Sequence, residues 1–199
     1  RFDTGPSLFT MPELVEELFL LCGENPPDHF ATLPLQSSCM YFWEDGTRVN
    51  AWQQGEDFAR EVENATGVNQ KKVMGFLKKS ARLYGLTKDV FLFESLHKPS
   101  NYIKKSFLKS LIRFYELDAF TTMHKRNVQW FRHPKVVQLF DRYATYNGSN
   151  PYKTPATLNI IGHLEHNTGA SFPAKGMFDI VESLTGLAIR QGVKIRLNS

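Results

Sequence analysis

The chain has 199 residues, 42% of them hydrophobic and 22% charged, and its formal net charge is +4 at neutral pH. This composition is ordinary for a globular chain and excludes an intrinsically disordered tail. Charged residues interrupt every apolar stretch before it reaches 18 residues. The sequence therefore predicts a chain that is soluble or held at a membrane surface, not one that spans the bilayer.

Charged residues divide the chain into three unlike parts. Residues 1–70 carry 3 Lys or Arg and 12 Asp or Glu, residues 71–135 carry 15 and 4, and residues 136–199 carry 6 and 4. The basic middle part is typical of a surface that attracts a polyanion or an anionic membrane, and a solvated lysine-rich helix face explains it equally well. The two cysteines, Cys22 and Cys39, are too few for a disulfide framework, which favours a reducing compartment.

A helix is predicted after a short extended start. Thr10 is a candidate N-cap, Pro12 suits the first turn, and the acidic residues that follow suit the positive end of a helix. The apolar stripe of residues 14–22 predicts a helix that is buried on most sides and ends at Gly23.

A β-hairpin is predicted next, because the apolar period changes from helical to alternating. Residues 38–43 and 47–52 have the alternating pattern of strands, and they flank the short segment Glu44-Asp45-Gly46. Gly46 suits the positive φ that a tight turn requires.

A long helical region follows from Gln54 for about 90 residues and predicts a helical layer. Breaks are expected at Gly67, Gly85, Pro99 and Pro134. The candidate caps beside the first three breaks are Asn69, Thr87 and Ser100.

Two segments of this layer are amphipathic. In residues 71–84 apolar side chains share one face, and five Lys or Arg side chains occupy the other. Residues 101–117 carry an apolar stripe that is unusually wide, with lysines elsewhere.

The last third begins with a helix at Pro134 that is expected to end at residues 147–148. Residues 150–155 contain two prolines and predict a rigid loop before another helix.

The C-terminal segment predicts a short extended stretch at residues 169–173, a helix from Lys175 to Gly192 and a strand at residues 192–197. A helix that leads by one tight turn into a strand is typical of a sheet with further strands, and this chain contains only the first part of such a sheet. We therefore interpret the chain as a piece of a longer protein. The predicted fold class is α+β, with a mixed β-sheet and a large helical layer.

The chain lacks the sequence motifs of a self-sufficient catalytic site. No G-x-G-x-x-G pattern for dinucleotide binding, no P-loop for phosphate binding and no G-x-S-x-G pattern of α/β-hydrolases occurs. His163 and His166 lie one helical turn apart with Glu165 between them, but no third ligand is visible, and we predict no metal site. Aromatic residues such as those at 41–43 and 130–131 indicate a core or the lining of a large apolar ligand rather than a base-stacking surface.

Five short segments occur in an order that resembles one enzyme family. They are FDTGP at 2–6, FWEDGT at 42–47, YNGSNPY at 146–152, HLE at 163–165 and FPAKGM at 172–177. Each segment is weak evidence alone, but in this order, over nearly the whole chain, they resemble the bacterial carotenoid desaturases of the phytoene type.

The resemblance implies the substrate domain of a two-domain, amine-oxidase-like flavoprotein, incomplete at both ends. Residues 1–10 would cross from the flavin domain, residues 11–172 would bind the substrate, and residues 173–199 would cross back. FAD would be bound mainly by segments outside this chain. The residues of this chain that would approach it are Asp3, Thr4, Gly5, Pro6, Gly176 and Met177.

The resemblance further implies a polyene substrate, from which the flavin accepts a hydride. A long hydrocarbon needs a dry aromatic and aliphatic lining, and the composition fits this need. The candidates for the tunnel wall are Tyr146, Asn147, Pro151 and Tyr152. His163 or Glu165 would act as acid, base or hydrogen-bond partner, although a buried Glu beside a His is as often a structural pair.

One residue departs from the family pattern. The family has Pro-x-Gly-Gly at the return crossing, whereas this chain has Lys175 where the first glycine is expected. Because paired glycines allow close backbone approach to a planar ring, the lysine puts tight flavin packing there in doubt.

The basic helices acquire a second interpretation from the resemblance. A polyene must be drawn from a bilayer, so lysines beside wide apolar helices would dock on anionic headgroups, and we expect a cytoplasmic protein that is peripheral on the inner face of the membrane. Nucleic acid is disfavoured as a partner because the acidic first part of the chain would repel a polyanion. The alternative function is a non-enzymatic membrane- or lipid-binding module.

Overall fold

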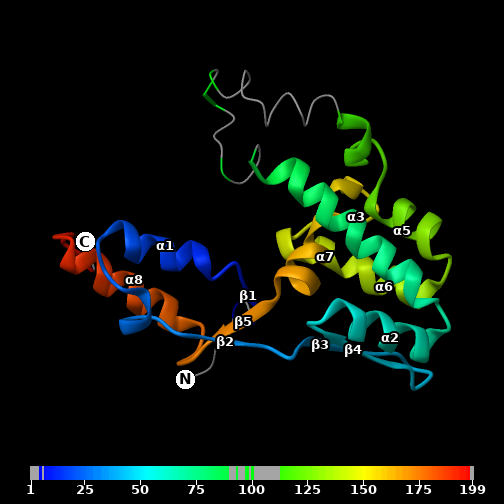
Figure 1. The fold of residues 1–199 in the computed structure, drawn as a ribbon, viewed down its shortest axis with the longest axis horizontal. Helices are drawn as coiled ribbons and strands as arrows, with labels where there is room; N and C mark the ends of the chain where they lie inside the picture. Colours follow the sequence, from blue (N-terminus) through cyan, green and yellow to red (C-terminus); the bar gives the residue numbers. More distant parts are fainter. Residues whose placement is uncertain are drawn as a thin grey trace.

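Two unequal parts make up the computed structural model, which describes residues 5, 7–89, 93, 97, 98, 100 and 113–197. The smaller part contains β1 (Phe9–Thr10), α1 (Glu13–Leu21), the 3-10 helix η1 (Pro26–Asp28), β2 (Thr32–Pro34), β5 (Ala170–Pro173) and α8 (Phe178–Arg190). In Figure 1 this part lies at the left, and α1 and α8 lie side by side.

The larger part is a helical layer with a β-hairpin at its edge (Figure 1). Its strands are β3 (Ser37–Phe42) and β4 (Arg48–Trp52). Its longer helices are α2 (Gly55–Thr66), α3 (Gln70–Lys88), α5 (Met123–Phe131) and α6 (Pro134–Asp141). Short helical segments join them, namely η4 (Phe114–Leu117), η5 (Arg142–Asn147), η6 (Ala156–Ile160), α7 (Ile161–His163) and the π-helical η7 (Leu164–Thr168).

The predicted α+β class with a large helical layer is confirmed, but the described strands form small antiparallel sheets instead of the predicted mixed sheet. A three-stranded sheet has the order β1-β5-β2, with Phe9 opposite Ser171 and Thr32 opposite Pro173. Since β5 follows directly from η7, this sheet joins the two parts of the molecule. None of the described helices is long and apolar enough to cross a membrane.

The first predicted helix is present, but its start differs from the prediction. Thr10 lies in β1 instead of capping the helix, and the N-cap position is occupied by Pro12. Thr10 is drawn into the sheet because β1 pairs with β5, a partner far away in the sequence. Met11, at φ +57°, makes the turn between strand and helix.

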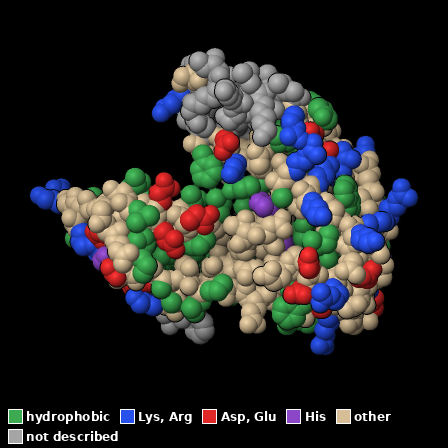
Figure 2. Space-filling model, viewed as in Figure 1, with side chains coloured by type: hydrophobic (Ala, Val, Ile, Leu, Met, Phe, Trp, Pro, Cys, Tyr) green, Lys and Arg blue, Asp and Glu red, His purple; other side chains and the backbone are tan. Residues whose placement is uncertain are grey.

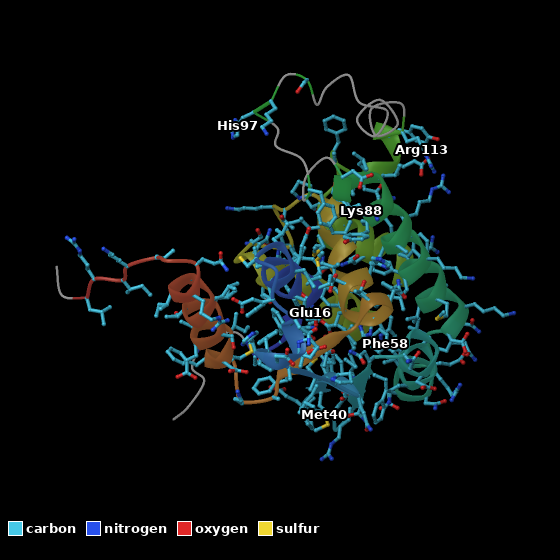
Figure 3. All side chains as sticks on the ribbon, turned by 60° about the vertical axis from the view of Figure 1, so that its left-hand side comes forward. Glu16, Met40, Phe58, Lys88, His97 and Arg113 are labelled. Carbon is cyan, nitrogen blue, oxygen red and sulfur yellow. The ribbon has the colours of Figure 1, made fainter. Side chains whose placement is uncertain are left out.

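The predicted hairpin is confirmed. Gly46 has φ +82°, its N–H donates to the Trp43 carbonyl at 3.0 Å, and the two strands pair through residues such as Tyr41 and Val49. Alternation determines which side chains face inward: Val49 and Ala51 are fully buried, whereas Met40 is exposed and lies at the outer edge of the hairpin (Figure 3).

Helices α2 and α3 meet at the predicted break. Gly67 ends α2 at φ +76°, and the side chain of Asn69 caps α3 by accepting from the N–H of Lys71 at 2.9 Å. The predicted break at Gly85, however, is wrong, because α3 continues to Lys88.

Tertiary packing explains this continuation. Leu83 and Leu86, on either side of Gly85, are buried against Leu117, and burial of two leucines outweighs the cost of about 1 kcal/mol for glycine in a helix. Thr87, predicted as a cap, is itself buried, and its hydroxyl donates to the Leu83 carbonyl at 2.8 Å.

Two predicted features beyond this helix have different outcomes. Pro99 and residues 101–112, most of the second amphipathic segment, lie outside the described residues. The strand predicted at residues 193–197 is wrong, because this stretch has no regular secondary structure. An alternating segment becomes a strand only when another strand satisfies its backbone hydrogen bonds, and none of the described strands pairs with it.

The main core lies between α2, α3, α6 and the hairpin, and aromatic rings fill its centre. The Phe140 ring lies 4.4 Å from the Phe76 ring and 4.6 Å from the Phe131 ring, measured between centroids. Phe58 stacks on His166 at 3.9 Å, and Figure 3 shows it in the interior beside the turn that leads to β5.

Gly169 forms the turn that connects the helical layer to β5, and its substitution by alanine is expected to cost about 1–3 kcal/mol. Its backbone has φ +100° and ψ 160°, a region open essentially to glycine alone, and an added Cβ would lie 2.7 Å from Nε2 of Gln53. Urea unfolding of G169A measures the cost. The matched substitution G148A, at φ +64° with nothing within 4 Å of its Cβ, is expected to cost less, and an equal cost would contradict the close-contact argument.

Candidate functional site

A groove of about 820 Å³ follows the hairpin formed by α5 and α6. Val128 and Val137 line it from the two helices, and Pro151 and Tyr152 line it from the following loop. Pockets of this size, mostly apolar with a few polar groups, are where proteins bind small molecules.

Local sequence signals build the groove. Arg132 ends α5 in the left-handed conformation, and Pro134 starts α6 two residues later, so the helices double back on each other. The loop is tied to the start of α5, because the N–H of His124 donates to the Pro151 carbonyl at 3.0 Å. The Asn150 side chain in turn accepts from the N–H of Tyr152 at 2.9 Å.

A histidine and an aspartate face each other across the hairpin at one wall of the groove. Nδ1 of His124 lies 2.7 Å from Oδ2 of Asp141, and the Asn127 side chain donates to Oδ1 of Asp141 at 2.8 Å. The His124 ring also packs on the Tyr152 ring, with centroids 4.2 Å apart. The imidazole orientation is therefore fixed from two sides, while 31% of the side chain remains exposed.

Arg142 connects the groove to a buried polar cluster behind it. Its Nη2 lies 2.9 and 2.8 Å from the two carboxylate oxygens of Glu165, and its Nε donates to the Tyr41 hydroxyl at 2.6 Å. The guanidinium also lies 5.0 to 5.7 Å from the ring centroids of Tyr41, Tyr143 and Tyr146. Three electron-rich ring faces stabilise a cation in this position.

Glu165, a sequence candidate for acid or base, is fully buried in this cluster. Besides Arg142, it accepts hydrogen bonds from Ser38 Oγ and Tyr146 Oη, each at 2.5 Å. Burial raises the pKa of Glu165, but the Arg142 charge and these hydrogen bonds lower it by more, so its pKa lies below the usual range. An ionised carboxylate whose two oxygens are both occupied positions Arg142 and does not exchange protons.

His166 is buried as a neutral ring. Its Nδ1 lies 3.0 Å from the Trp52 carbonyl, which only accepts, so Nδ1 carries the proton, and Nε2 accepts from the Tyr143 hydroxyl at 2.7 Å. Burial lowers the pKa of His166 below its ordinary value. Protonation would also leave the Tyr143 hydroxyl without its acceptor.

The stability of the protein is therefore expected to fall with acidification through His166. Because the folded pKa lies below the unfolded one, this contribution is complete above about pH 6.5 and is lost as the pH falls toward the folded pKa, at up to about 1.4 kcal/mol per pH unit. Urea unfolding of the wild type and of H166Q between pH 8 and pH 5 measures this slope. The slope just below pH 6.5 should be weaker in H166Q, and equal slopes would contradict the assignment.

The structure places the two alternative candidates, His163 and Glu165, in different surroundings. His163 packs on Tyr84 of α3, with ring centroids 4.8 Å apart, and its Nδ1 lies 2.8 Å from the side-chain nitrogen of Asn167. The π-helical turn after α7 instead directs Glu165 and His166 into the core.

The predicted tunnel residues divide between two places. Pro151 and Tyr152 line the groove, whereas Tyr146 hydrogen-bonds Glu165 from outside the groove. Asn147 is exposed at the end of η5.

Sequence reasoning did not single out His124, Asp141 and Arg142. Asp141 lies four residues after Val137 on the apolar stripe of α6, and a charged residue on such a stripe was the available signal. No local sequence signal predicts the pairing of Asp141 with His124, because the two residues meet only when α6 packs against α5.

Three of the predicted cofactor residues, Asp3, Thr4 and Pro6, lie outside the described residues. Of the others, Gly5 is exposed, and Gly176 has φ +97° just before α8, where Met177 occupies the N-cap position. Because β1 and β5 are antiparallel, the chain enters β1 beside the point at which it leaves β5. The start of β1 and the end of β5, which adjoin the two predicted cofactor segments in the sequence, therefore lie at one edge of the sheet.

Lys175 does not disturb the backbone at this edge. Among the described residues, the non-glycine residues with positive φ are Met11, Asp118 and Arg132, so Lys175 does not have a positive φ. Its side chain is 75% exposed. Its Nζ lies 3.9 Å from Oδ1 of Asp179, in the first turn of α8. The left-handed conformation falls on Gly176 alone, so the turn keeps its glycine where positive φ requires one.

No group of three His, Cys, Asp or Glu side chains among the described residues is arranged to hold a metal ion. Cys22 and Cys39 are both free thiols. The site therefore consists of the groove, the His124 and Asp141 pair, and the cluster around Glu165.

Comparison with known proteins gives one consistent group. No protein-family model matches the chain. It is 41% identical over 196 residues to the 1-hydroxycarotenoid 3,4-desaturase of Flavobacterium sp., covering 98% of this chain and 40% of that protein. It is 28% identical over 199 residues to the 4,4'-diapolycopene oxygenase of Methylomonas sp., covering 100% and 39%. It is 25% identical over 193 residues to the carotenoid 3,4-desaturase of Haloarcula japonica, covering 97% and 39%.

These matches confirm the predicted resemblance, and none of them favours a non-enzymatic lipid-binding module. The chain spans about 40% of the length of these curated relatives. With its five motif segments in order, the chain is similar over nearly its whole length to curated carotenoid desaturases.

Proposed function

We propose that the full-length protein is an FAD-dependent oxidoreductase that dehydrogenates a carotenoid polyene, and that this chain supplies the part that holds the substrate. The observation that carries the proposal is the 41% identity to a 1-hydroxycarotenoid 3,4-desaturase across 98% of the chain. The apolar groove supports it, and so does the position of the start of β1 beside the end of β5, the two strand ends that adjoin the proposed cofactor segments in the sequence.

Desaturation breaks two C–H bonds and forms one C=C bond. FAD, when bound, supplies the oxidant, since it accepts one hydrogen as a hydride while the other leaves as a proton to a base or to water. Gly5 and Gly176 would lie against the flavin, because the backbone of a residue without a side chain can approach a ring closely. Gly176 also adopts the positive φ that glycine favours. We propose a structural role for Glu165 rather than that of the base, because its oxygens accept hydrogen bonds from Arg142, Ser38 and Tyr146.

A flavin spectrum and a desaturation assay of the full-length protein test this function. We expect a yellow protein with stoichiometric FAD that converts a carotenoid to a product with one more double bond. A colourless protein that still binds lipid would overturn the proposal in favour of the lipid-binding module. Residues 1–199 alone are expected to retain little or no flavin, and stoichiometric binding would contradict the proposed boundaries at residues 10 and 173.

We further propose that the protein lies in the cytoplasm and docks on the inner face of the membrane through the basic face of α3. Lys71 and Lys78 lie on one line of this helix and are exposed, and Figure 2 shows Lys and Arg side chains gathered over the helical layer. Part of the basic charge is neutralised, because Lys79 pairs with Asp118 and Arg82 pairs with Glu116. Each remaining cation near an anionic surface contributes about 1 kcal/mol.

Sedimentation with vesicles tests the docking surface. We expect the full-length protein to sediment with vesicles rich in phosphatidylserine, to stay in solution with neutral vesicles, and to dissociate at high salt. The variant K71E/K78E should lose most of this binding. The matched variant K153E/K194E, which reverses two charges outside α3, should lose less, and equal losses would refute α3 as the docking face.

A further inference from the structure

We propose that the groove between α5 and α6 binds the oxygen-bearing end of the polyene, and that His124, held by Asp141, recognises a hydroxyl group there. This inference rests on the proposed function and adds a residue that determines substrate specificity.

The polar group at the wall of the groove suits a hydroxyl. Both oxygens of Asp141 accept hydrogen bonds, one from Nδ1 of His124 and one from Asn127. Nδ1 therefore carries its proton, and Nε2 of His124, which has no hydrogen-bond partner among the described residues, is left for a ligand. A hydroxyl group can donate to Nε2, whereas an apolar chain end would leave Nε2 unsatisfied.

Most of the remaining surface of the groove is apolar and suits a hydrocarbon, although His133, Gln138 and Thr145 also line it. Val128, Pro134, Val137 and Pro151 line it together with the Tyr152 ring, which also fixes the imidazole plane. The volume of about 820 Å³ accommodates the terminal segment of a long chain rather than a single small polar molecule.

Arg142 does not provide an anion site in this groove, although it lies at the wall. Its guanidinium is engaged by Glu165 and by the Tyr41 hydroxyl, and a ligand anion would compete with a fully buried carboxylate. Arg132, exposed at the end of α5, is the remaining arginine of the lining. A polyene carboxylate therefore belongs among the probes, because Arg132 is the group that would prefer it.

The experiment compares three probes on the full-length flavoprotein in detergent micelles: 1-hydroxylycopene, lycopene and the C40 polyene with a terminal carboxylate. We expect 1-hydroxylycopene to bind about tenfold more tightly than lycopene, which is the effect of one hydrogen bond of about 1.4 kcal/mol. In H124F, which keeps an aromatic ring beside Tyr152 but has no Nε2, this ratio of Kd values should fall to about one.

His29 offers a matched control, because it too stacks on an aromatic ring, that of Phe19, and pairs with a carboxylate, Glu24 at 3.0 Å, in the smaller part of the molecule. H29F should keep the tenfold ratio of about 1.4 kcal/mol. The proposal is overturned if H124F keeps the ratio as well, or if the carboxylate binds most tightly.

Binding and turnover are measured separately, so the two proposals fail in different ways. Desaturation that proceeds with no effect of H124F on the ratio would refute the hydroxyl site and leave the enzyme function standing. A hydroxyl preference that depends on His124, in a protein that desaturates none of the probes, would refute the enzyme function and leave the hydroxyl site standing.

If H124F does not fold, the unmutated protein still decides the question. With histidine side chains labelled with ¹⁵N, one Nε2 resonance should shift on addition of 1-hydroxylycopene and not on addition of lycopene. An unchanged spectrum with both probes would refute the hydroxyl site.

Discussion

Replacement of Arg142 by methionine is expected to destabilise the protein by about 3–5 kcal/mol, because it leaves the buried Glu165 carboxylate without its counter-charge. Methionine retains most of the apolar stem and loses the hydrogen bonds to Glu165 and Tyr41. Urea unfolding followed by circular dichroism measures the loss.

The surface provides a matched control for this substitution. Arg60 pairs with Asp57 at 3.3 Å, but both side chains are more than half exposed, so R60M is expected to cost less than about 1 kcal/mol. The double variant R142M/E165M removes both charges and should be more stable than the sum of the two single losses predicts. A cost for R142M as small as that for R60M would show that Glu165 does not depend on Arg142.

Truncation of Phe140 to alanine is expected to cost about 3–5 kcal/mol, the range for a large aromatic side chain removed from a core. The ring is fully buried and lies within 5 Å of the rings of Phe76 and Phe131, so their packing prevents the core from closing over the cavity. Because α6 carries both Phe140 and Asp141, the same change should also loosen the groove wall.

Chemical unfolding of F140A gives the loss, and Lys125 on the neighbouring helix provides the comparison. K125A removes an exposed side chain from α5 and is expected to change stability by less than about 0.5 kcal/mol. A loss below about 1 kcal/mol for F140A would mean that the aromatic centre is not the main core of the helical layer.

Local sequence signals predicted the elements whose conformation depends on a few neighbouring residues. Gly46 and Gly67 adopt the positive φ that their positions require, Asn69 caps α3, and Pro134 begins α6. In each case the signal and the structure that it determines lie within one turn of the chain.

Predictions that depended on distant partners were less successful. Gly85 did not break α3, because Leu83 and Leu86 pack on Leu117. Thr10 joined a strand, because β5 lies beside it. The alternating segment at residues 193–197 formed no strand, since alternation alone does not supply a neighbour.

The location of the candidate site was predicted only in part. Pro151 and Tyr152 were predicted to contact substrate, and they line the groove, although substrate contact itself stays a prediction. Glu165 was singled out, but its ion pair with Arg142 was not predicted.

The sequence by itself determined the resemblance to carotenoid desaturases, through motif segments that keep their order, and the α+β class, through the periods of its apolar residues. Only the tertiary structure decided that Asp141 holds His124, that Arg142 neutralises Glu165 and that the start of β1 lies beside the end of β5. The physical reason is that buried charges and strand pairing depend on contacts between residues far apart in the chain. Neither the apolar period nor the local propensity of a segment encodes which distant residue pairs with a buried charge or which strand accepts its backbone hydrogen bonds.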